Sequence, residues 1–597
     1  MSSQQGENAP SKETKKPFIS TFLTKLRKRH IIETLAAFIG GGWLLLEFVH
    51  WLLVDHYHFP EKTIDVTFAT ILGALLCTLV WRWFSGRERP RKFKLELFLI
   101  PLVALITILL DINLLLHLRA PESGAMSTSK WKNSVAVLPF DNISPEEGQD
   151  YFCDGLTDEL ITRLSNLREL KVIAKTSAYA FKGKEIDIRE IGKKLNVATV
   201  LEGGVRKSGN KLRITAQLIN VSDGSHLWSD SWDKDITDVF AIQDEIALAV
   251  ADKMKLTLLS DEKTRLVKRP MDNVSAYEFY LRASREIDRY REDALDRAIQ
   301  YLQNGLDLIG ENALVYSAMA YAYWQYVNIG AKQEDYITKA EEYANKAQVL
   351  DPDSPNALLI LGLIESAFRG NQQESVRHLK KALLINPNDP VVLFWLANVY
   401  FQYVGKISAA IPLAQRLLQL DPLNPLSYEI QVVGYFYDGR YDLALGQVTK
   451  ALQMDPGNLG NLYRYAIVLA YNKKSIEAFP IIEQMAKDSP NNVFSKIALL
   501  LKFGLLKDRE QMLQIMTPDF QKTCQRDAAF SYDIAIILAL LGEKNEALYW
   551  LENAVNRGFI NFPLLAEKDP WLADLRGDER FLKLIERVKY EWEHFEE

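Results

Sequence analysis

The sequence predicts a multidomain protein with three transmembrane helices, then a small α/β domain, then an all-α solenoid of helix pairs. Three observations divide the 597 residues in this way. Three apolar segments of about 20 residues lie within 31–118. Alternating strand and helix patterns fill 134–258, and after position 350 a proline-containing motif returns every 34 or 35 residues.

Composition and charge exclude several classes of function. The net charge of −6 argues against a nucleic-acid partner, which needs a concentrated basic surface. Cys77, Cys153 and Cys524 are too scattered for a disulfide framework, and there is no CxxC motif. No nucleophile with a matching base and no metal triad can be assembled from the pattern. We therefore expect no catalytic residues, no metal and no cofactor.

The apolar segments predict a membrane protein. Each of the three is long enough to cross the hydrocarbon core, and Lys and Arg gather in the leader and in the second connection, "RWFSGRERPRKFK". We expect a multi-pass protein of the bacterial inner (plasma) membrane with cytoplasmic N-terminus and periplasmic later domains. The predicted parts are a polar, basic tail at 1–30, spans at 31–54, 64–84 and 95–118, and a linker at 119–133.

Asp111 is the acidic residue within the third apolar segment. A carboxyl group at that depth is costly and often faces a protein partner. The residue is therefore a candidate for an intramembrane helix contact. Alternatively, its side chain reaches the outer interface, since it lies only about two turns from the end of the segment.

Residues 134–258 alternate between strand and helix patterns. "SVAVLPF" predicts a buried strand from Ser134, and 150–167 predicts a helix. Two further strands flank Ser208-Gly209-Asn210, which is a hairpin signal. Alternation of this kind is typical of a compact α/β layer.

The stretch "DYFCDGLTDELITRLSNL" resembles a reactive centre because it places a cysteine among acids. On a helical wheel, however, Cys153 joins an apolar stripe, so we expect a buried and inert thiol. Asp154 and Asp158 are predicted on the solvated face, together with Thr162 and Ser165. Arg163 falls within the stripe, which leaves open whether it extends to water or pairs with a carboxylate. The stripe consists of Phe152, Leu156, Leu160, Leu164 and Leu167.

Several segments of this region resemble the TolB-like amino-terminal domain of bacterial proteins. They include "VAVLPFDNIS", "YFCDGLTDELITRLS", "VIAKTSAYAFKG" and "VFAIQDEIALAV". The resemblance implies a non-catalytic sensing or interaction module beside helical repeats, as in CadC-like regulators and some class III adenylate cyclases. Those proteins carry a DNA-binding or cyclase domain, for which the predicted cytoplasmic segments here leave no room.

A repeat of tetratricopeptide period fills residues 270–597. "DPDSP", "NPNDP", "DPLNP", "DPGNL" and "SPNNV" begin at positions 351, 386, 421, 455 and 489. Gly370, Gly405 and Gly439 keep the same spacing and predict the turn inside each helix pair. We expect about seven to eight repeats with a C-terminal cap, stacked into a solenoid with an extended concave surface.

The first helix of each repeat should line that concave surface. Aromatic and amide groups there suit an extended peptide or a partner helix, although the same residues are also suited to packing between repeats. The candidates are Trp395, Gln402, Tyr403, Glu429, Phe436, Tyr437, Tyr463 and Tyr471.

Two functions follow from these patterns. The first is a non-enzymatic, membrane-anchored scaffold or adaptor in the cell envelope, which binds proteins through the repeat groove. The second is a sensor that relays an extracytoplasmic cue through its membrane helices to a separate cytoplasmic effector, such as an adenylate cyclase or a transcription regulator. The sequence specifies neither the partner nor the oligomeric state.

Overall fold

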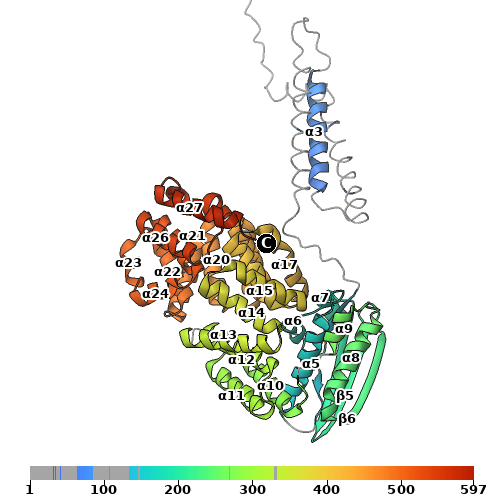
Figure 1. Ribbon diagram of the computed structural model, residues 1–597. Helices are drawn as coiled ribbons and strands as arrows, with labels where there is room; N and C mark the ends of the chain where they lie inside the picture. Colours follow the sequence, from blue (N-terminus) through green and yellow to red (C-terminus); the bar gives the residue numbers. More distant parts are fainter. Residues whose placement is uncertain are drawn as a thin grey trace, which may run out of the picture. The chain divides into compact units, whose positions relative to one another are not determined.

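The computed structural model describes residues 63–84, 133–144, 148–267, 269, 271–328 and 333–597, with single positions 31, 34, 41, 47 and 107. These residues fall into two compact units, 1–127 and 128–597. In the first unit the continuous element is helix α3, Thr63–Phe84 (Figure 1). The second unit holds a sheet domain followed by helix pairs.

The predicted multi-pass membrane topology is wrong. Within the described part of the chain, no helix is both long enough and apolar enough to cross a membrane. The sequence of α3 includes Asp65 and Arg82, and the uncharged stretch between them is shorter than the roughly 20 residues that a span needs. Apart from single positions, the predicted spans 31–54 and 95–118, with Asp111, lie outside the described residues.

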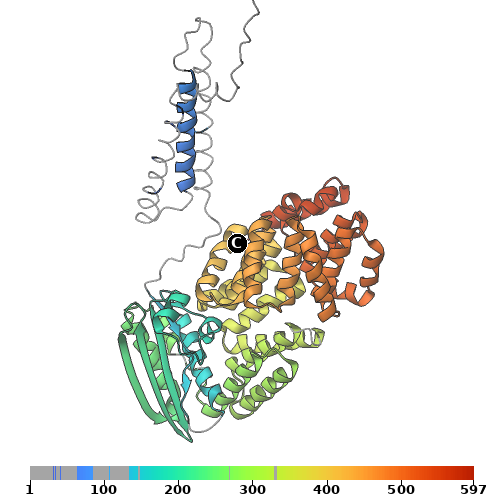
Figure 2. The same ribbon diagram turned by 180° about the vertical axis from the view of Figure 1, so that it is seen from behind.

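The sheet domain contains a mixed sheet. Its strands have the order β3-β1-β4-β5-β6, with β2 paired to β4. Strands β3 and β1 run parallel to their neighbours up to β4, while β4, β5 and β6 are antiparallel (Figure 2, green). The strands are β1 (Ser134–Val137), β2 (Asp141–Asn142), β3 (Lys171–Val172), β4 (Thr199–Ser208), β5 (Lys211–Asn220) and β6 (His226–Asp235).

Side-chain alternation explains how the strands pack. In β5, Leu212, Ile214 and Ala216 are buried, whereas Arg213 and Thr215 between them are exposed. Helices cover both faces of the sheet near β1. They are α5 (Asp150–Ser165), α6 (Lys175–Tyr179), α7 (Ile188–Leu195), α8 (Val239–Lys253) and α9 (Ser260–Leu266). The predicted hairpin is confirmed, with Gly209 at a φ of 53° in the turn between β4 and β5.

The rest of the chain forms consecutive helix pairs. The first helices of the pairs are α10 (Val274–Ile287), α12 (Ala313–Asn328), α14 (Pro355–Ile364), α16 (Pro390–Asn398), α18 (Pro425–Tyr437), α20 (Leu459–Tyr471), α22 (Val493–Leu506) and α25 (Ala528–Leu541). The second helices are α11 (Glu292–Ile309), α13 (Gln333–Leu350), α15 (Gln372–Ile385), α17 (Ile407–Leu420), α19 (Tyr441–Met454), α21 (Ser475–Asp488), α23 (Arg509–Ile515) with α24 (Pro518–Gln525), and α26 (Lys544–Asn556). Helix α27 (Glu579–Glu593) follows. The helical-repeat prediction is confirmed by this arrangement.

The repeated motif works at the start of each pair. Its fourth residue caps the next helix: Asp389, Asn424 and Asn458 each accept a hydrogen bond from a backbone N–H of the first turn. Pro390 and Pro425 occupy the first helical position, where a missing N–H has no cost. The motif therefore ends one pair and starts the next.

The turn glycines behave as predicted. Gly370, Gly405 and Gly439 have φ values of 68°, 75° and 79°, a conformation that other residues avoid. In two pairs the first helix ends in a π-helical turn, namely η3 (Glu365–Arg369) and η4 (Val399–Val404).

Two of the repeat motifs form hydrogen bonds with the sheet domain. The Nδ2 of Asn388 donates to the carbonyl oxygens of Ser165, Leu167 and Leu170, at 2.9, 3.3 and 3.0 Å. This amide therefore satisfies the carbonyl of Ser165, which ends α5 and has no partner inside the helix, and two carbonyls of the segment that follows.

The second contact uses the next motif. Ser177 donates from its backbone N–H and from its Oγ to Oδ1 of Asp421, at 3.0 and 2.5 Å. Its Oγ also accepts from the N–H of Leu423 at 2.9 Å. Both Ser177 and Asp421 are fully buried, so the α/β domain and the repeats form one packed unit.

We predict that Asn388→Ala lowers the free energy of unfolding by about 2–3 kcal/mol, because it leaves buried carbonyl groups without a donor. Urea denaturation of the full-length protein measures the change. The matched control is Asn491→Ala, which removes the exposed asparagine at the equivalent motif position and should change stability by less than about 0.5 kcal/mol. Equal effects of the two substitutions would contradict the role given to Asn388.

Candidate functional site

The acidic face of α5 lies against the first repeat helix, α10. A Cβ atom added to Gly155 would come within 2.6 Å of the Leu281 side chain, so the two helices cross closely at this glycine. Ser165, on the face that the sequence assigns to solvent, is buried. The predicted solvated face is therefore covered only in part: Asp154 and Asp158 are half-buried, whereas Thr162 is exposed as predicted.

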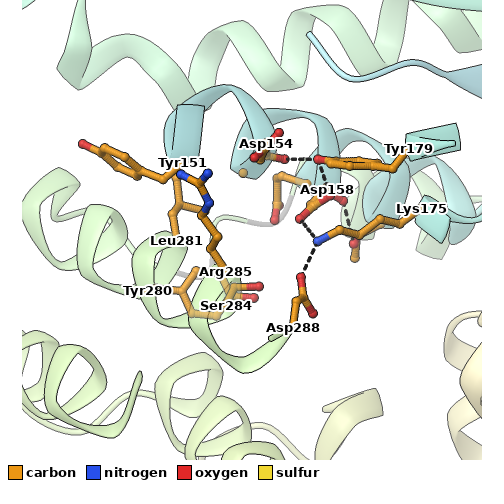
Figure 3. A pocket seen from close by; sticks show the side chains of 13 residues that line it. Tyr151, Asp154, Asp158, Lys175, Tyr179, Tyr280, Leu281, Ser284, Arg285 and Asp288 are labelled. Atoms are coloured by element: carbon orange, nitrogen blue, oxygen red, sulfur yellow. Dashed lines mark hydrogen bonds and ion pairs between the residues drawn. The ribbon is translucent and has the colours of Figure 1, made fainter. Parts of the chain in front are cut away.

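A cavity of about 250 Å³ lies at this crossing (Figure 3). Helices α5, α6 and α10 provide its walls, which carry carboxylates, hydroxyls and two cationic groups. The lining residues are Tyr151, Asp154, Gly155, Asp158, Glu159, Thr162, Lys175, Tyr179, Tyr280, Leu281, Ser284, Arg285 and Asp288.

Lys175 connects the two sides of the cavity. Its Nζ lies 2.5 Å from Oδ2 of Asp158 on α5 and 2.7 Å from Oδ2 of Asp288, which caps α10. Figure 3 shows this cation between the two carboxylates, with the Tyr179 hydroxyl on the same side. That hydroxyl donates to Oδ1 of Asp158 at 2.9 Å. Lys182 forms a further ion pair with Asp154.

Burial changes the protonation of this cluster. Burial raises the pKa of Asp158 to about 6, although Lys175 opposes the shift. Burial acts to lower the pKa of Lys175, but Asp158 and Asp288 outweigh it and hold this pKa above its ordinary value. At neutral pH the cluster is therefore an ion-paired network that carries one cation for two carboxylates.

A second cavity of about 180 Å³ adjoins the first and shares Tyr280, Ser284 and Asp288 with it. Its remaining walls come from α12, α14 and α16, which are first helices of consecutive pairs. We call the two cavities together the junction groove. The second cavity adds Ile287, Ala318, Tyr321, Asn356, Leu359, Asp389 and Val391.

The thiol in α5 is not part of this chemistry. Cys153 is buried as predicted, and burial, with Asp154 and Asp150, raises its pKa to about 12. Such a thiol is protonated at neutral pH and a weak nucleophile. Among the residues that the structure describes, no group of three or more His, Cys, Asp or Glu side chains is placed to hold a metal ion.

The structure answers the question that the sequence leaves open for Arg163. This side chain is 3% exposed and pairs with Glu159, with an Nε–Oε1 distance of 2.8 Å, and with Asp244 on α8. It also donates to the carbonyl oxygen of Leu266 at 3.2 Å. Arg163 therefore cross-links three helices of the sheet domain instead of extending to water.

The predicted concave-surface residues lie mostly in the interior. Trp395, Tyr403 and Glu429 are partly exposed. The other five are buried, and they are Gln402, Phe436, Tyr437, Tyr463 and Tyr471. Residues from the C-terminal part of the chain cover several of them, since Trp571 stacks on Tyr471 with ring centroids 3.8 Å apart. Their role in binding a partner stays a prediction.

Sequence patterns did not reveal Lys175, Asp288 or Asn388. Lys175 and Asp288 are far apart in the chain and meet only because α10 packs on α5. Asn388 occupies a motif position that other repeats fill with Asp353, Leu423 or exposed Asn491. No local signal distinguishes it from those residues.

Comparison with known proteins supports the division into a sheet domain and repeats. Residues 131–249 match the family described as "HilA/YgeH-like transcriptional regulator, second domain". The TolB-like assignment of this domain stays a prediction.

Relatives of two kinds share part of the sequence. A Rhizobium meliloti (strain 1021) protein named "Putative adenylate cyclase 3" is 34% identical over 240 residues, which are 40% of this chain and 41% of that protein. "Transcriptional regulator HilA" of Salmonella typhimurium is 26% identical over 153 residues, 26% of this chain and 27% of that protein. The matched regions thus span well under half of either relative.

Solved structures of repeat proteins also show likeness to this chain. PilW, a type IV pilus biogenesis factor, is 17% identical, with 37% of this chain and 98% of PilW covered and a TM-score of 0.30. A thermophilic tetratricopeptide repeat protein of Thermus thermophilus, TTC0263, is 20% identical, with coverages of 33% and 99% and a TM-score of 0.27. The repeat fold itself follows from the helix pairs and their period.

The raised pKa of Asp158 gives a pH-dependent prediction. Its folded-state pKa of about 6 exceeds the unfolded value of roughly 3.9, so the folded state binds more protons between these values. Stability from this group is therefore lost as the pH rises from about 4 to about 6. We expect Asp158→Asn to lose less stability than wild type over this window in urea denaturation at stepped pH. Parallel pH profiles would contradict the assignment.

Proposed function

We propose that this chain is a non-enzymatic interaction protein whose sheet domain and repeats bind one partner segment together in the junction groove. Two adjoining cavities support this proposal, because they share lining residues of α10. Their other walls come from α5, α6, α12, α14 and α16. A groove on the inner helices of a repeat array is the usual place for an extended peptide to bind.

The chemistry of the groove favours a basic segment. Of the four lining carboxylates, Asp154 and Glu159 are paired with Lys182 and Arg163. Asp158 and Asp288 share the single cation of Lys175. A lysine or arginine side chain of the partner would pair with these two carboxylates, and the ring of Tyr280 offers a cation–π contact. Each cavity accommodates one or two side chains, so a short extended segment fits better than a folded domain.

A photo-crosslinking experiment tests the groove. A photoreactive phenylalanine replaces Tyr280 in the full-length protein, which is irradiated in its native host cells. We expect to recover a crosslinked partner protein when the photoreactive residue is at position 280. We expect none when it replaces Tyr549 instead, which is exposed on α26.

A charge substitution sharpens this experiment. Asp288→Asn in the crosslinking variant keeps the shape of the wall and removes one carboxylate, so the yield of a basic partner should fall about threefold to tenfold. The same protein captured equally from both tyrosine positions, or no protein captured from Tyr280, would contradict the proposal.

Signalling is the second candidate function. The match of residues 131–249 to a regulator domain and the relative named as an adenylate cyclase favour it. In this form of the proposal, the sheet domain and repeats regulate a cyclase or a transcription regulator encoded as a separate protein.

The signalling proposal predicts which partner is recovered. Crosslinked co-purification of the full-length chain should yield a nucleotide cyclase or a DNA-binding regulator. The photoreactive phenylalanine at position 280 should crosslink to that same protein. Recovery of structural proteins alone, with no such effector, would favour a scaffold and contradict signalling.

A further inference from the structure

The chain departs from the helix-pair pattern after α26. Residues 557–571, which we call the C-terminal strap, run past the turn glycines of three successive repeats. A Cβ atom added to Gly370 would meet the backbone of Arg557, and one added to Gly405 would meet the side chain of Asn561. One added to Gly439 would contact Lys568, which also pairs with Asp438. The strap thus follows the order of the repeats.

The strap binds the repeats as a peptide ligand would. The backbone N–H of Ile560 donates to the carbonyl oxygen of Tyr403 at 2.8 Å. The Nδ2 of Asn561 donates to the carbonyl oxygens of Phe401 and Gln402, at 3.1 and 3.2 Å. All three acceptors belong to the π-helical turn η4, where the end of a helix leaves carbonyl groups available.

Aromatic side chains anchor both ends of the strap. Phe559 stacks on Tyr532 with ring centroids 4.6 Å apart and lies 6.1 Å from the ring of Tyr437. Trp571 stacks on Tyr471. Between these anchors, Asp569 accepts hydrogen bonds from the hydroxyls of Tyr471 and Tyr532.

Polar side chains lie beneath the strap among the aromatic rings. The hydroxyls of Tyr437 and Tyr463 are buried there, with Arg464 beside Tyr437 and Asp533 beside Tyr463. The covered surface therefore combines apolar rings with polar groups that a bound segment can contact.

We propose that the concave surface formed by α16, α18, α20 and α25 is a second peptide-binding site, which the strap occupies until a partner segment displaces it. The partner is a segment that copies the strap, including its helical turn at Leu564–Lys568. It carries a Phe, an Asn two residues later, and an Asp-Pro-Trp sequence near its end. Gln402, Tyr403, Phe436, Tyr437 and Tyr471 would contact it. This site is separate from the junction groove, and the inference does not rest on the groove.

A synthetic peptide of residues 557–571, labelled with a fluorophore, tests the inference. Asn561→Ala in the full-length protein removes two hydrogen bonds from the strap and should strengthen binding of the peptide about tenfold, measured by anisotropy. Hydrogen exchange should rise in 558–571 and in 399–405. A milder variant, Lys568→Ala, should strengthen binding about twofold while the protein stays folded.

The control is Asn472→Ala. Its Nδ2 likewise donates to two carbonyl oxygens, those of Tyr441 and Val468, which belong to neighbouring helix pairs and not to the strap. It should leave peptide binding unchanged, and a scrambled peptide should bind none of the variants. The inference is overturned if Asn561→Ala and Lys568→Ala bind the peptide no better than wild type, or if strap and repeats exchange together as one unit.

Discussion

One amide joins the sheet domain to the repeats. The carbonyl groups of Ser165, Leu167 and Leu170, where α5 ends and in the segment after it, are buried between the two. The amide of Asn388 donates to all three of them. Because the donor comes from a repeat motif, separating the sheet domain from the repeats would remove it from the carbonyls of Ser165 and Leu170.

Fixing the two domains together creates the junction groove. Lys175 and Asp288 come from different domains, and their ion pair exists only while α10 rests on α5. The same crossing takes Asp154 and Asp158 partly out of water and makes them the walls of a cavity. The packing of the two domains thus turns charged residues on their surfaces into the walls of the junction groove.

The two parts of the concave surface differ in whether other residues cover them. Its N-terminal part, on α10 to α16, borders open cavities, whereas its C-terminal part is covered by residues 557–571. The covered part contains most of the aromatic residues that the sequence predicts to bind a partner. One repeat array therefore has an open part and a covered part.

Local sequence patterns specify the sheet domain, the repeat period, the turn glycines and the apolar stripe of α5. Each of these depends on local geometry, such as a helical cap at Asn424 or a left-handed turn at Gly405, so a short stretch specifies it. The buried thiol of Cys153 follows from the same helical periodicity. Apolar composition, by contrast, predicted membrane helices that the described residues do not contain.

Which polar residues meet depends on how distant segments of the chain pack together. Ser177 and Asp421 are 244 positions apart, and Asn561 and Phe401 are 160 apart. No periodic pattern records such pairs, because they depend on how far the solenoid curves back on the sheet domain and on its own C-terminus. Arg163 is a further example. Helical periodicity predicts its place in an apolar stripe, but it does not predict the carboxylate partner on α8.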